Sequence, residues 1–387
     1  MPWNTKTVKA VRVQMLEQYE SGDFEIAELA RFYGISRKSV YKWIWRYEEA
    51  GVEGLADQSR APHRHPNAVE AEVVGMILEL KARWPRWGAP KLRHKLRASL
   101  SQEALPAEST VSKILQRYGL TSGARRRRPA AATPTGLREY EKANGVWCAD
   151  FKGWFKTGDG KRCTPLTISD GYSRYLLRCQ GLDEKTDRLA VQPLFAATFR
   201  EFGLPLSIRT DNGPPFASVG LEGLSALSVW WMRLGIEVER IEPGCPQQNG
   251  RHERMHRTLK EATARPPQAS LRAQQRAFDR FVQEYNFERP HEALEQMTPA
   301  SWYESSPREF PERLPAAPPY PDEWQKRRVR SGGQIKWQGH NVQVTTALAG
   351  EVVGLEPKDD GLWAVHFVSQ KLGQFNERTY RITPHGN

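Results

Sequence analysis

Three acidic residues lie in local sequences that suit a catalytic site. Asp150 lies in an apolar, strand-like run, Asp211 follows a second such run, and Glu253 stands near the start of a helical segment. Carboxylates that share one pocket repel one another strongly unless divalent cations lie between them. Such a set therefore indicates metal-assisted chemistry on phosphate groups.

Each acid taken alone has an ordinary structural explanation. Asp150 could be a surface residue of an edge strand, and Asp211 could begin an Asx turn. Glu253 could complement the dipole at the start of a helix. Catalysis is favoured because all three occur together and the sequence PQQNG, at 246–250, leads into the third.

Two motifs around these acids resemble the catalytic core of insertion-sequence transposases related to retroviral integrases, the DDE class with an RNase H-like fold. The motifs are TDNG at 210–213 and PQQNGRHERMH at 246–256, within a resemblance that covers roughly residues 146–302. It implies that Asp150, Asp211 and Glu253 are the catalytic and metal-binding residues. Two Mg²⁺ ions, replaceable by Mn²⁺, would lie ~3.5–4 Å apart. Asp150 would bridge them, and each of the other acids would hold one ion.

The interval between the last two acids departs from the family pattern. It contains 41 residues in this chain, whereas about thirty-five are usual in the family. We place the excess in residues 217–228 and expect a surface connection there, since loop closure becomes only slowly more costly with length.

The residues around the third acid are expected to approach DNA ends: Gln248, Asn249, Arg251, His256 and Lys260. Lys260 shares a helix face with Glu253 and is expected to hold a phosphate, with a solvated lysine as the alternative. His256 shares that face too, and is either a DNA contact or a hydrogen-bond partner of a carboxylate.

The expected secondary structure suits an RNase H-like α/β core over residues 141–305. In order, the elements are strands at 146–155, 163–170 and 172–180, a helix ending near Gly203, a strand at 206–210, a helix at 223–234, a strand at 236–241 and a helix at 251–264. A further helix at 275–285 leads to a closing segment with a mainly structural role. Arg289 and His291 in that segment are weak DNA-contact candidates.

Residues 1–60 are predicted to form a helix-turn-helix domain. Apolar residues repeat at helical spacing from Val8, a second short helix ends at Gly34, and Ser36 can cap a third helix that closes at Gly51. The start of the third helix would enter the major groove. Expected contacts there are Arg37, Lys38, Ser39, Tyr41 and Lys42. A solvated basic face of an ordinary bundle is the alternative.

A second helix-turn-helix domain is predicted over residues 66–122. Gly88 and Pro90 separate its first two helices, and Ser109 can cap the third. The resemblance implies binding to terminal inverted repeats; the alternative is a spacer or dimerisation module. Residues 123–140 read as a basic linker. Its four adjacent arginines are expected to contact phosphates: Arg125, Arg126, Arg127 and Arg128.

Residues 325–387 are predicted to form a small SH3-like β-barrel. About five short alternating runs with glycine turns between them predict its strands. Basic residues at its entry favour contact with the DNA backbone, and a protein–protein module is the alternative. The whole chain is thus expected to be a multidomain α+β protein.

Composition agrees with a polyanionic partner. The 387 residues include 57 Lys and Arg against 45 Asp and Glu, a net charge of +12. No apolar run approaches the ~20 residues that span a bilayer, and the first residues show no signal pattern. We therefore expect no membrane contact and a cytoplasmic, nucleoid-associated protein of bacteria. The four cysteines are scattered and are expected to be reduced: Cys148, Cys163, Cys179 and Cys245.

These features predict a DNA transposase that binds the terminal inverted repeats of its element, cleaves the 3′ ends and joins them to target DNA. It should be a homo-oligomer, at least a dimer, because two ends must be brought together. An accessory regulatory protein is left open. One alternative is a catalytically silent, transposase-derived DNA-binding protein, against which the three acids argue. Another is a metal-dependent nuclease without strand transfer, against which the two helix-turn-helix units argue.

Overall fold

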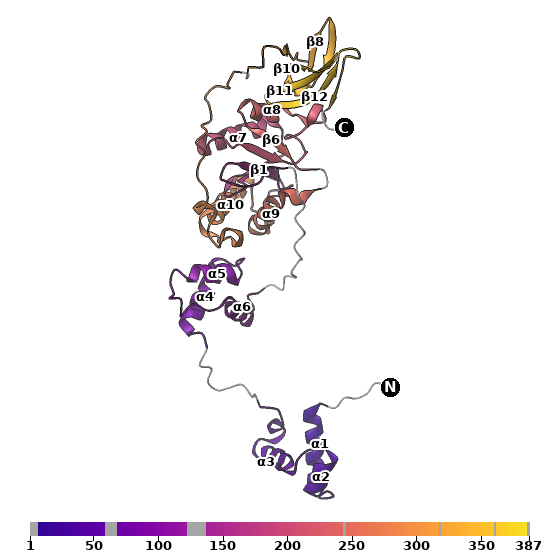
Figure 1. The fold of residues 1–387 in the computed structure, drawn as a ribbon. Helices are drawn as coiled ribbons and strands as arrows, with labels where there is room; N and C mark the ends of the chain where they lie inside the picture. The colour runs from indigo at the N-terminus through magenta and orange to yellow at the C-terminus, as the bar shows by residue number, and fades with distance from the viewer. Residues whose placement is uncertain are drawn as a thin grey trace. The chain divides into compact units, whose positions relative to one another are not determined.

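The computed structural model describes residues 7–58, 68–121, 137–242, 245–316, 319–359 and 361–384 (Figure 1). It divides into two compact units, Met1–Glu70 and Ala71–Asn387. The predicted arginine cluster Arg125–Arg128 lies outside the described residues. Among the described residues, no helix is long and apolar enough to cross a membrane.

The first unit is a three-helix domain. Its helices are α1 (Val8–Glu20), α2 (Ile26–Phe32) and α3 (Arg37–Gly54). The Ser36 side chain accepts a hydrogen bond from the Ser39 N–H, as predicted for a cap, and Gly51 breaks the helical backbone with φ +60°. Val8, the first residue of the predicted apolar repeat, is exposed, and Met15 and Leu16 fill the core from α1.

A second helical bundle begins the second unit. It consists of α4 (Ala71–Arg83), α5 (Ala89–Leu96) and α6 (Glu108–Arg117). Gly88 caps α5, and Pro90 lies in its first turn, where a missing N–H costs nothing. The predicted cap Ser109 is wrong: α6 already begins at Glu108, after Ala107, so Ser109 lies inside the helix.

A mixed sheet forms the centre of the second unit. Its strands are β1 (Val146–Phe151), β2 (Phe155–Lys156), β3 (Arg162–Asp170), β4 (Leu176–Leu182), β5 (Ser207–Thr210) and β6 (Glu237–Arg240). The order is β2-β3-β1-β5-β6, with β4 also paired to β3. β1 runs parallel to β5 and antiparallel to β3. The single strand predicted at 146–155 is wrong, since Gly153 has φ +70° and separates β1 from β2.

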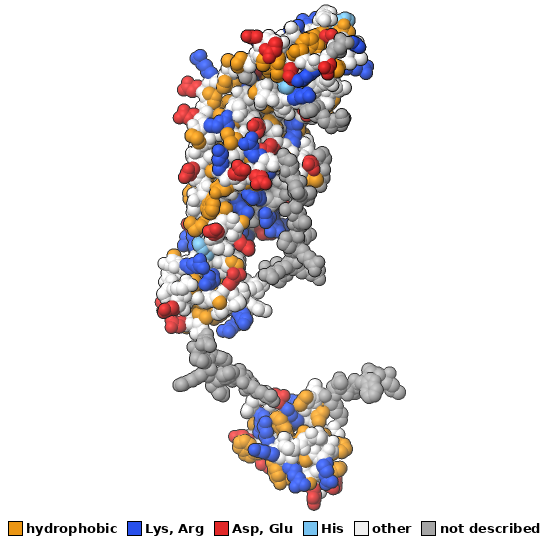
Figure 2. All heavy atoms as spheres, viewed as in Figure 1, with side chains coloured by type: hydrophobic (Ala, Val, Ile, Leu, Met, Phe, Trp, Pro, Cys, Tyr) orange, Lys and Arg blue, Asp and Glu red, His pale blue; other side chains and the backbone are white. Residues whose placement is uncertain are grey.

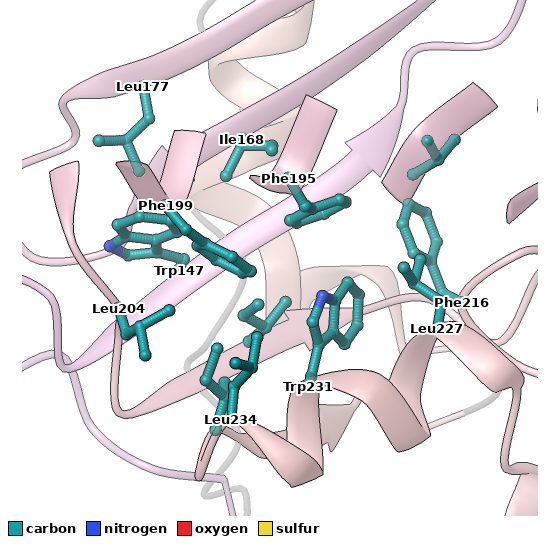
Figure 3. Packing of buried hydrophobic residues seen from close by; sticks show 14 of the residues in the cluster. Trp147, Ile168, Leu177, Phe195, Phe199, Leu204, Phe216, Leu227, Trp231 and Leu234 are labelled. Atoms are coloured by element: carbon teal, nitrogen blue, oxygen red, sulfur yellow. The ribbon is translucent and has the colours of Figure 1, made fainter. Parts of the chain in front are cut away.

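Four helices pack against the central sheet through two buried clusters. The helices are α7 (Arg188–Phe202), α8 (Ala226–Arg233), α9 (Gly250–Thr263) and α10 (Leu271–Gln283). One cluster joins Trp147 of β1 to Phe195 of α7 and Trp231 of α8 (Figure 3). The other joins Cys163 of β3 to Met255 of α9 and Phe278 of α10. This layered α/β core is the predicted one.

Short turns complete the α/β part of the chain. They are η1 (Leu221–Gly223), η2 (Pro246–Asn249), the π turn η3 (Glu284–Glu288), η4 (Glu292–Leu294), η5 (Pro299–Ser301) and, in the last domain, η6 (Thr346–Leu348). All four cysteines are free thiols.

The C-terminal part is an antiparallel β domain, as predicted. Its strands are β7 (Gln325–Arg328), β8 (Gln334–Trp337), β9 (His340–Gln343), β10 (Val352–Pro357), β11 (Leu362–Phe367), β12 (Gln370–Asn376) and β13 (Arg381–Pro384). Five of them form a sheet in the order β13-β12-β11-β10-β7, and β8 pairs with β9. The sequence reading missed β7 and β13, the two edge strands.

The extra residues between the last two acids are not a plain surface connection. Leu224 is fully buried and belongs to the same apolar cluster as Ile335 and Leu372 of the β domain. Arg233, at the end of α8, forms an ion pair with Glu351. The predicted surface loop is therefore a contact between the core and the C-terminal domain.

Candidate active site

Asp150 and Asp211 lie at the same edge of the central sheet. In the parallel pair β1 and β5, Cys148 is opposite Arg209. Two residues further along each strand direction comes an acid, Asp150 after Cys148 and Asp211 after Arg209. The two carboxylates therefore lie next to each other at the ends of neighbouring strands. Glu253 comes from the first turn of α9.

Electrostatics connect the three acids. The pKa of Asp150 is raised to about 7, chiefly by burial and then by the charges of Asp211 and Glu253, while the Phe151 N–H and Lys152 lower it. The carboxylates are therefore close enough to oppose one another's ionisation. A nearby cation would offset this repulsion.

The acids do not form a closed ligand set in this conformation. Among the described residues, no three His, Cys, Asp or Glu side chains lie together in a geometry that could hold a metal ion. Asp150 and Asp211 are half-buried, whereas Glu253 is exposed. Carboxylate oxygens are the ligands that Mg²⁺ prefers, so the donor chemistry fits a divalent cation while the arrangement of the donors is open.

Asp211 also makes the turn that its sequence allowed. Its Oδ1 accepts the N–H of Gly213 at 3.1 Å. This is the Asx turn that offered an ordinary explanation for the residue. It does not compete with a site role, because the same carboxylate acts on Asp150.

A buried polar cluster lies next to Asp150. His256 Nδ1 is 3.6 Å from Asp150 Oδ2. The Thr167 hydroxyl contacts His256 Nε2 at 2.6 Å and His252 Nε2 at 2.7 Å, and Ser169 Oγ contacts His252 Nδ1 at 2.8 Å. Burial is the main cause of a lowered pKa in both histidines. The pKa of His252 is lowered to about 3, and that of His256 is also lowered, so both rings are neutral.

Sequence reading missed His252, Thr167 and Ser169. A signal was available for the histidines: His252, Met255, His256 and Leu259 follow helical spacing and form the buried side of α9. The partners on β3 could not be found in this way, because their register against α9 is a long-range property.

Three predicted DNA contacts point inward instead. Gln248, Asn249 and His256 are 9%, 4% and 2% exposed. Gln248 Oε1 accepts the Glu242 N–H at 2.7 Å, which ties η2 to the end of β6. His256 lies beside the Asp150 carboxylate, in line with the second of its two predicted roles, and the buried Asn249 Oδ1 has no hydrogen-bond partner. Contact of these three residues with DNA stays a prediction.

Other predicted DNA contacts are accessible. On α3, Arg37, Lys38, Tyr41 and Lys42 are exposed, and Ser39 is half-buried beside Ser36. The exposed Trp45, one helical turn after Tyr41, was not predicted. On α9, Lys260 is exposed, and Arg251 donates to the Gly171 carbonyl at 2.9 Å and lies over the Tyr140 ring.

Family comparisons cover most of the chain. Models described as integrase core domains match residues 140–246 and 234–299, and a helix-turn-helix model and a homeodomain-like model match 11–63 and 39–115. The C-terminal domain of IS481 family transposases matches residues 324–383. These matches support an insertion-sequence transposase with an integrase-type core.

Individual relatives come from bacteria and from viruses. An uncharacterized 39.2 kDa protein of insertion element IS476 from Xanthomonas euvesicatoria is 29% identical over 260 residues, covering 64% of this chain and 70% of the relative. A 31.7 kDa protein of IS407 from Burkholderia multivorans is 26% identical, covering 62% and 82%. A Gag-Pol polyprotein of baboon endogenous virus is 29% identical over 200 residues, covering 50% and 10%.

Solved structures with similarity to the chain include viral integrases. The catalytic core domain of HTLV-2 integrase in complex with magnesium has a TM-score of 0.33 at 17% identity, covering 42% of this chain and 99% of that one. A simian T-cell lymphotropic virus intasome in complex with a PP2A subunit has a TM-score of 0.36 at 20% identity, covering 76% and 97%.

Proposed function

We propose that this chain is a DNA transposase that binds the terminal inverted repeats of its own element, cleaves their 3′ ends and joins them to target DNA. The observation that carries the proposal is geometric: Asp150 and Asp211 follow neighbouring parallel strands at one edge of the sheet, and with Glu253 of α9 the nearby acids raise the pKa of Asp150. Three interacting carboxylates in a chain that also carries helical DNA-binding domains suit phosphoryl transfer on DNA.

The three acids would hold the metal. Two Mg²⁺ ions, or Mn²⁺ in their place, would activate the attacking hydroxyl and stabilise the leaving 3′ oxygen. Asp211 is oriented by the Gly213 N–H. Asp150 is flanked by the neutral His256 ring, which contacts its Oδ2 without adding charge. Glu253 is exposed on α9, so its side chain can turn toward the other two.

DNA recognition would come from the helical units. The exposed start of α3 presents Arg37, Lys38, Tyr41 and Lys42, and side chains of this kind contact phosphates and base edges. Joining two element ends to a target requires two active sites, so the working form would be at least a dimer.

The test is a strand-transfer assay with labelled DNA of the element's ends and Mg²⁺. We expect joined product from the wild type, and a loss of at least 100-fold in Asp211→Asn and Glu253→Gln, because each removes a metal ligand. Glu261→Gln, an exposed position on the same helix, is the matched control and should retain activity. Wild-type activity in either acid variant contradicts the assignment.

The open arrangement of the acids is the observation that favours a second candidate. A catalytically silent DNA-binding protein would bind the element's ends without cutting them at any Mg²⁺ or Mn²⁺ concentration. Cleavage without joining would instead indicate a nuclease.

A further inference from the structure

A basic pocket lies where α5 of the second bundle meets α9 and the segment after η3. Its volume is about 560 Å³. Six cationic side chains line it: Lys91, Arg174, Arg251, Arg254, Arg257 and Arg289. Figure 2 shows Lys and Arg side chains over α9 in this part of the molecule. Arg251, Arg289 and His291 of its lining were predicted only as separate DNA contacts, not as parts of one pocket.

The positive charge in the pocket is poorly compensated. None of the six cations lies within 4.0 Å of a carboxylate oxygen among the described residues. Burial, then Arg289, and also Arg174 lower the pKa of Lys91 to about 8, while Glu292 opposes them. Buried charges normally have partners. Among the described lining residues, Glu292 is the one acid against six cations, and Glu284 and Glu261 also act on Arg289, so positive charge exceeds negative charge in the pocket.

Two buried polar atoms in the pocket walls have no hydrogen-bond partner: Arg174 Nε and His291 Nε2. His291 is 7% exposed. Arg174 is held in the turn between β3 and β4 with φ +63°, a conformation that L-residues rarely adopt. Buried polar groups are nearly always satisfied. Burial lowers the pKa of His291 to about 3, so its ring is neutral and Nε2 can act as an acceptor. The Arg174 Nε–H is the donor that points to a missing acceptor oxygen.

The pocket is lined in part by the helix that carries Glu253 and lies at the junction with the second bundle. Arg251 and Arg254 are three residues apart on α9 and share one side of the helix that carries Glu253. Across the pocket, Lys91 donates to the Pro290 carbonyl. Nearby, Lys95 pairs with Glu288 at 2.8 Å and Trp87 Nε1 donates to Glu284 at 3.1 Å. These contacts hold α5 against the core.

We propose that this pocket binds a backbone phosphate of DNA, which Lys91 of the second bundle and the arginines of the core hold together. A tetrahedral phosphate offers oxygens to donors that converge from several directions, which a planar carboxylate does less well. The bound phosphate then fastens the second bundle to the core. This inference rests on the proposed function, since DNA supplies the phosphate; inorganic phosphate shares the chemistry.

The test is site-resolved lysine acylation at pH 8 on the full chain, read by mass spectrometry at Lys91. A 30-base-pair duplex of the element's end, added at a concentration that saturates a gel shift, should lower labelling of Lys91 at least fivefold. Inorganic phosphate should do so only at millimolar concentration, and a polyglutamate peptide of equal charge should not. Protection by the peptide equal to that by the duplex, or by micromolar phosphate, overturns the assignment to DNA.

Failure of this inference is distinguishable from failure of the proposed function. A duplex that binds but leaves Lys91 labelling unchanged overturns the pocket and leaves the transposase proposal standing. No duplex binding at any salt concentration overturns both.

Variants provide a second measurement. Arg174→Asn removes the cation while tolerating the positive φ, and Arg289→Gln removes a second cation. Each should weaken duplex binding roughly 3- to 10-fold and lower the slope of log affinity against log salt by about one. Arg276→Gln, an exposed arginine of α10 outside the pocket, changes the charge equally and should leave both unchanged. Equal losses in all three variants, with folding checked by circular dichroism, contradict a localised site.

Discussion

At the scale of single residues, Asp150 is unusual because its surroundings in the folded protein disfavour the ionised form of its carboxyl group. Burial and the neighbouring acids raise its pKa from 3.8 to about 7. The folded chain thus binds this proton more tightly than the unfolded chain does. Its contribution to stability is complete below pH ~4 and is lost as the pH rises through ~7. A cation between the acids would reverse this penalty.

We therefore predict a pH effect that is specific to Asp150. In EDTA, the free energy of unfolding of the wild type should fall by about 3 kcal/mol between pH 5 and 8 relative to Asp150→Asn. Mg²⁺ should remove most of this difference, because it favours the ionised acid. The measurement is urea unfolding at each pH. Parallel curves for the two proteins in EDTA would show that Asp150 titrates normally.

The hydroxyl of Thr167 gives a second prediction at this scale. It contacts the Nε2 atoms of His252 and His256, two buried histidines. Thr167→Val keeps the shape but leaves two ring nitrogens without this partner, so it should cost about 1–3 kcal/mol of unfolding free energy. Thr258→Val, on the outer part of α9, is a control that loses only a bond to its own helix. Equal costs for both variants would argue against the cluster.

At the scale of elements, caps and glycines set the helix boundaries. Ser36 and Gly51 were predicted and lie where expected in α3, because their local chemistry is sufficient. Ser109 was predicted as a cap and is not one, since α6 begins at Glu108. The strand break at Gly153 and the edge strands β7 and β13 were also missed. Their limits depend on pairing with distant strands, which a local pattern does not contain.

These two serines provide a matched comparison. Ser36→Ala removes a side-chain bond to the start of α3 and should destabilise the first unit by about 1 kcal/mol. Ser109→Ala removes no cap and, because alanine favours helices, should change stability by less than about 0.5 kcal/mol. Chemical denaturation of the full chain, followed by circular dichroism, measures both. The reverse order would mean that α6 begins at Ser109 in solution.

At the scale of the whole molecule, the core and the C-terminal domain share one apolar cluster. The family resemblance predicted the three acids, the core and the C-terminal domain, but it treated residues 217–228 as an ordinary insertion. Their contact with the β domain joins segments more than 100 residues apart, such as Leu224 and Ile335. No local sequence pattern records such a pairing, so this part of the fold needed the structure.

Truncating the buried leucine should therefore affect both domains. Leu224→Ala leaves a cavity in the shared cluster and should cost about 2–5 kcal/mol, with separate transitions for the core and the β domain in calorimetry. Val219→Ala, in the same segment but fully exposed, should leave the thermogram unchanged. A single unshifted transition in Leu224→Ala would show that the two domains are coupled by other contacts.

The paired histidines beneath Asp150 have a mechanical consequence. His252 and His256 lie one turn apart on α9, and both are anchored to the same hydroxyl of β3. Two anchors one turn apart prevent α9 from rolling about its axis or sliding along the sheet without breaking both. The helix is therefore held in one position, and the side chain of the exposed Glu253 is the part of this site that can move. Gathering the third acid toward the other two then requires a change of rotamer rather than a movement of the fold.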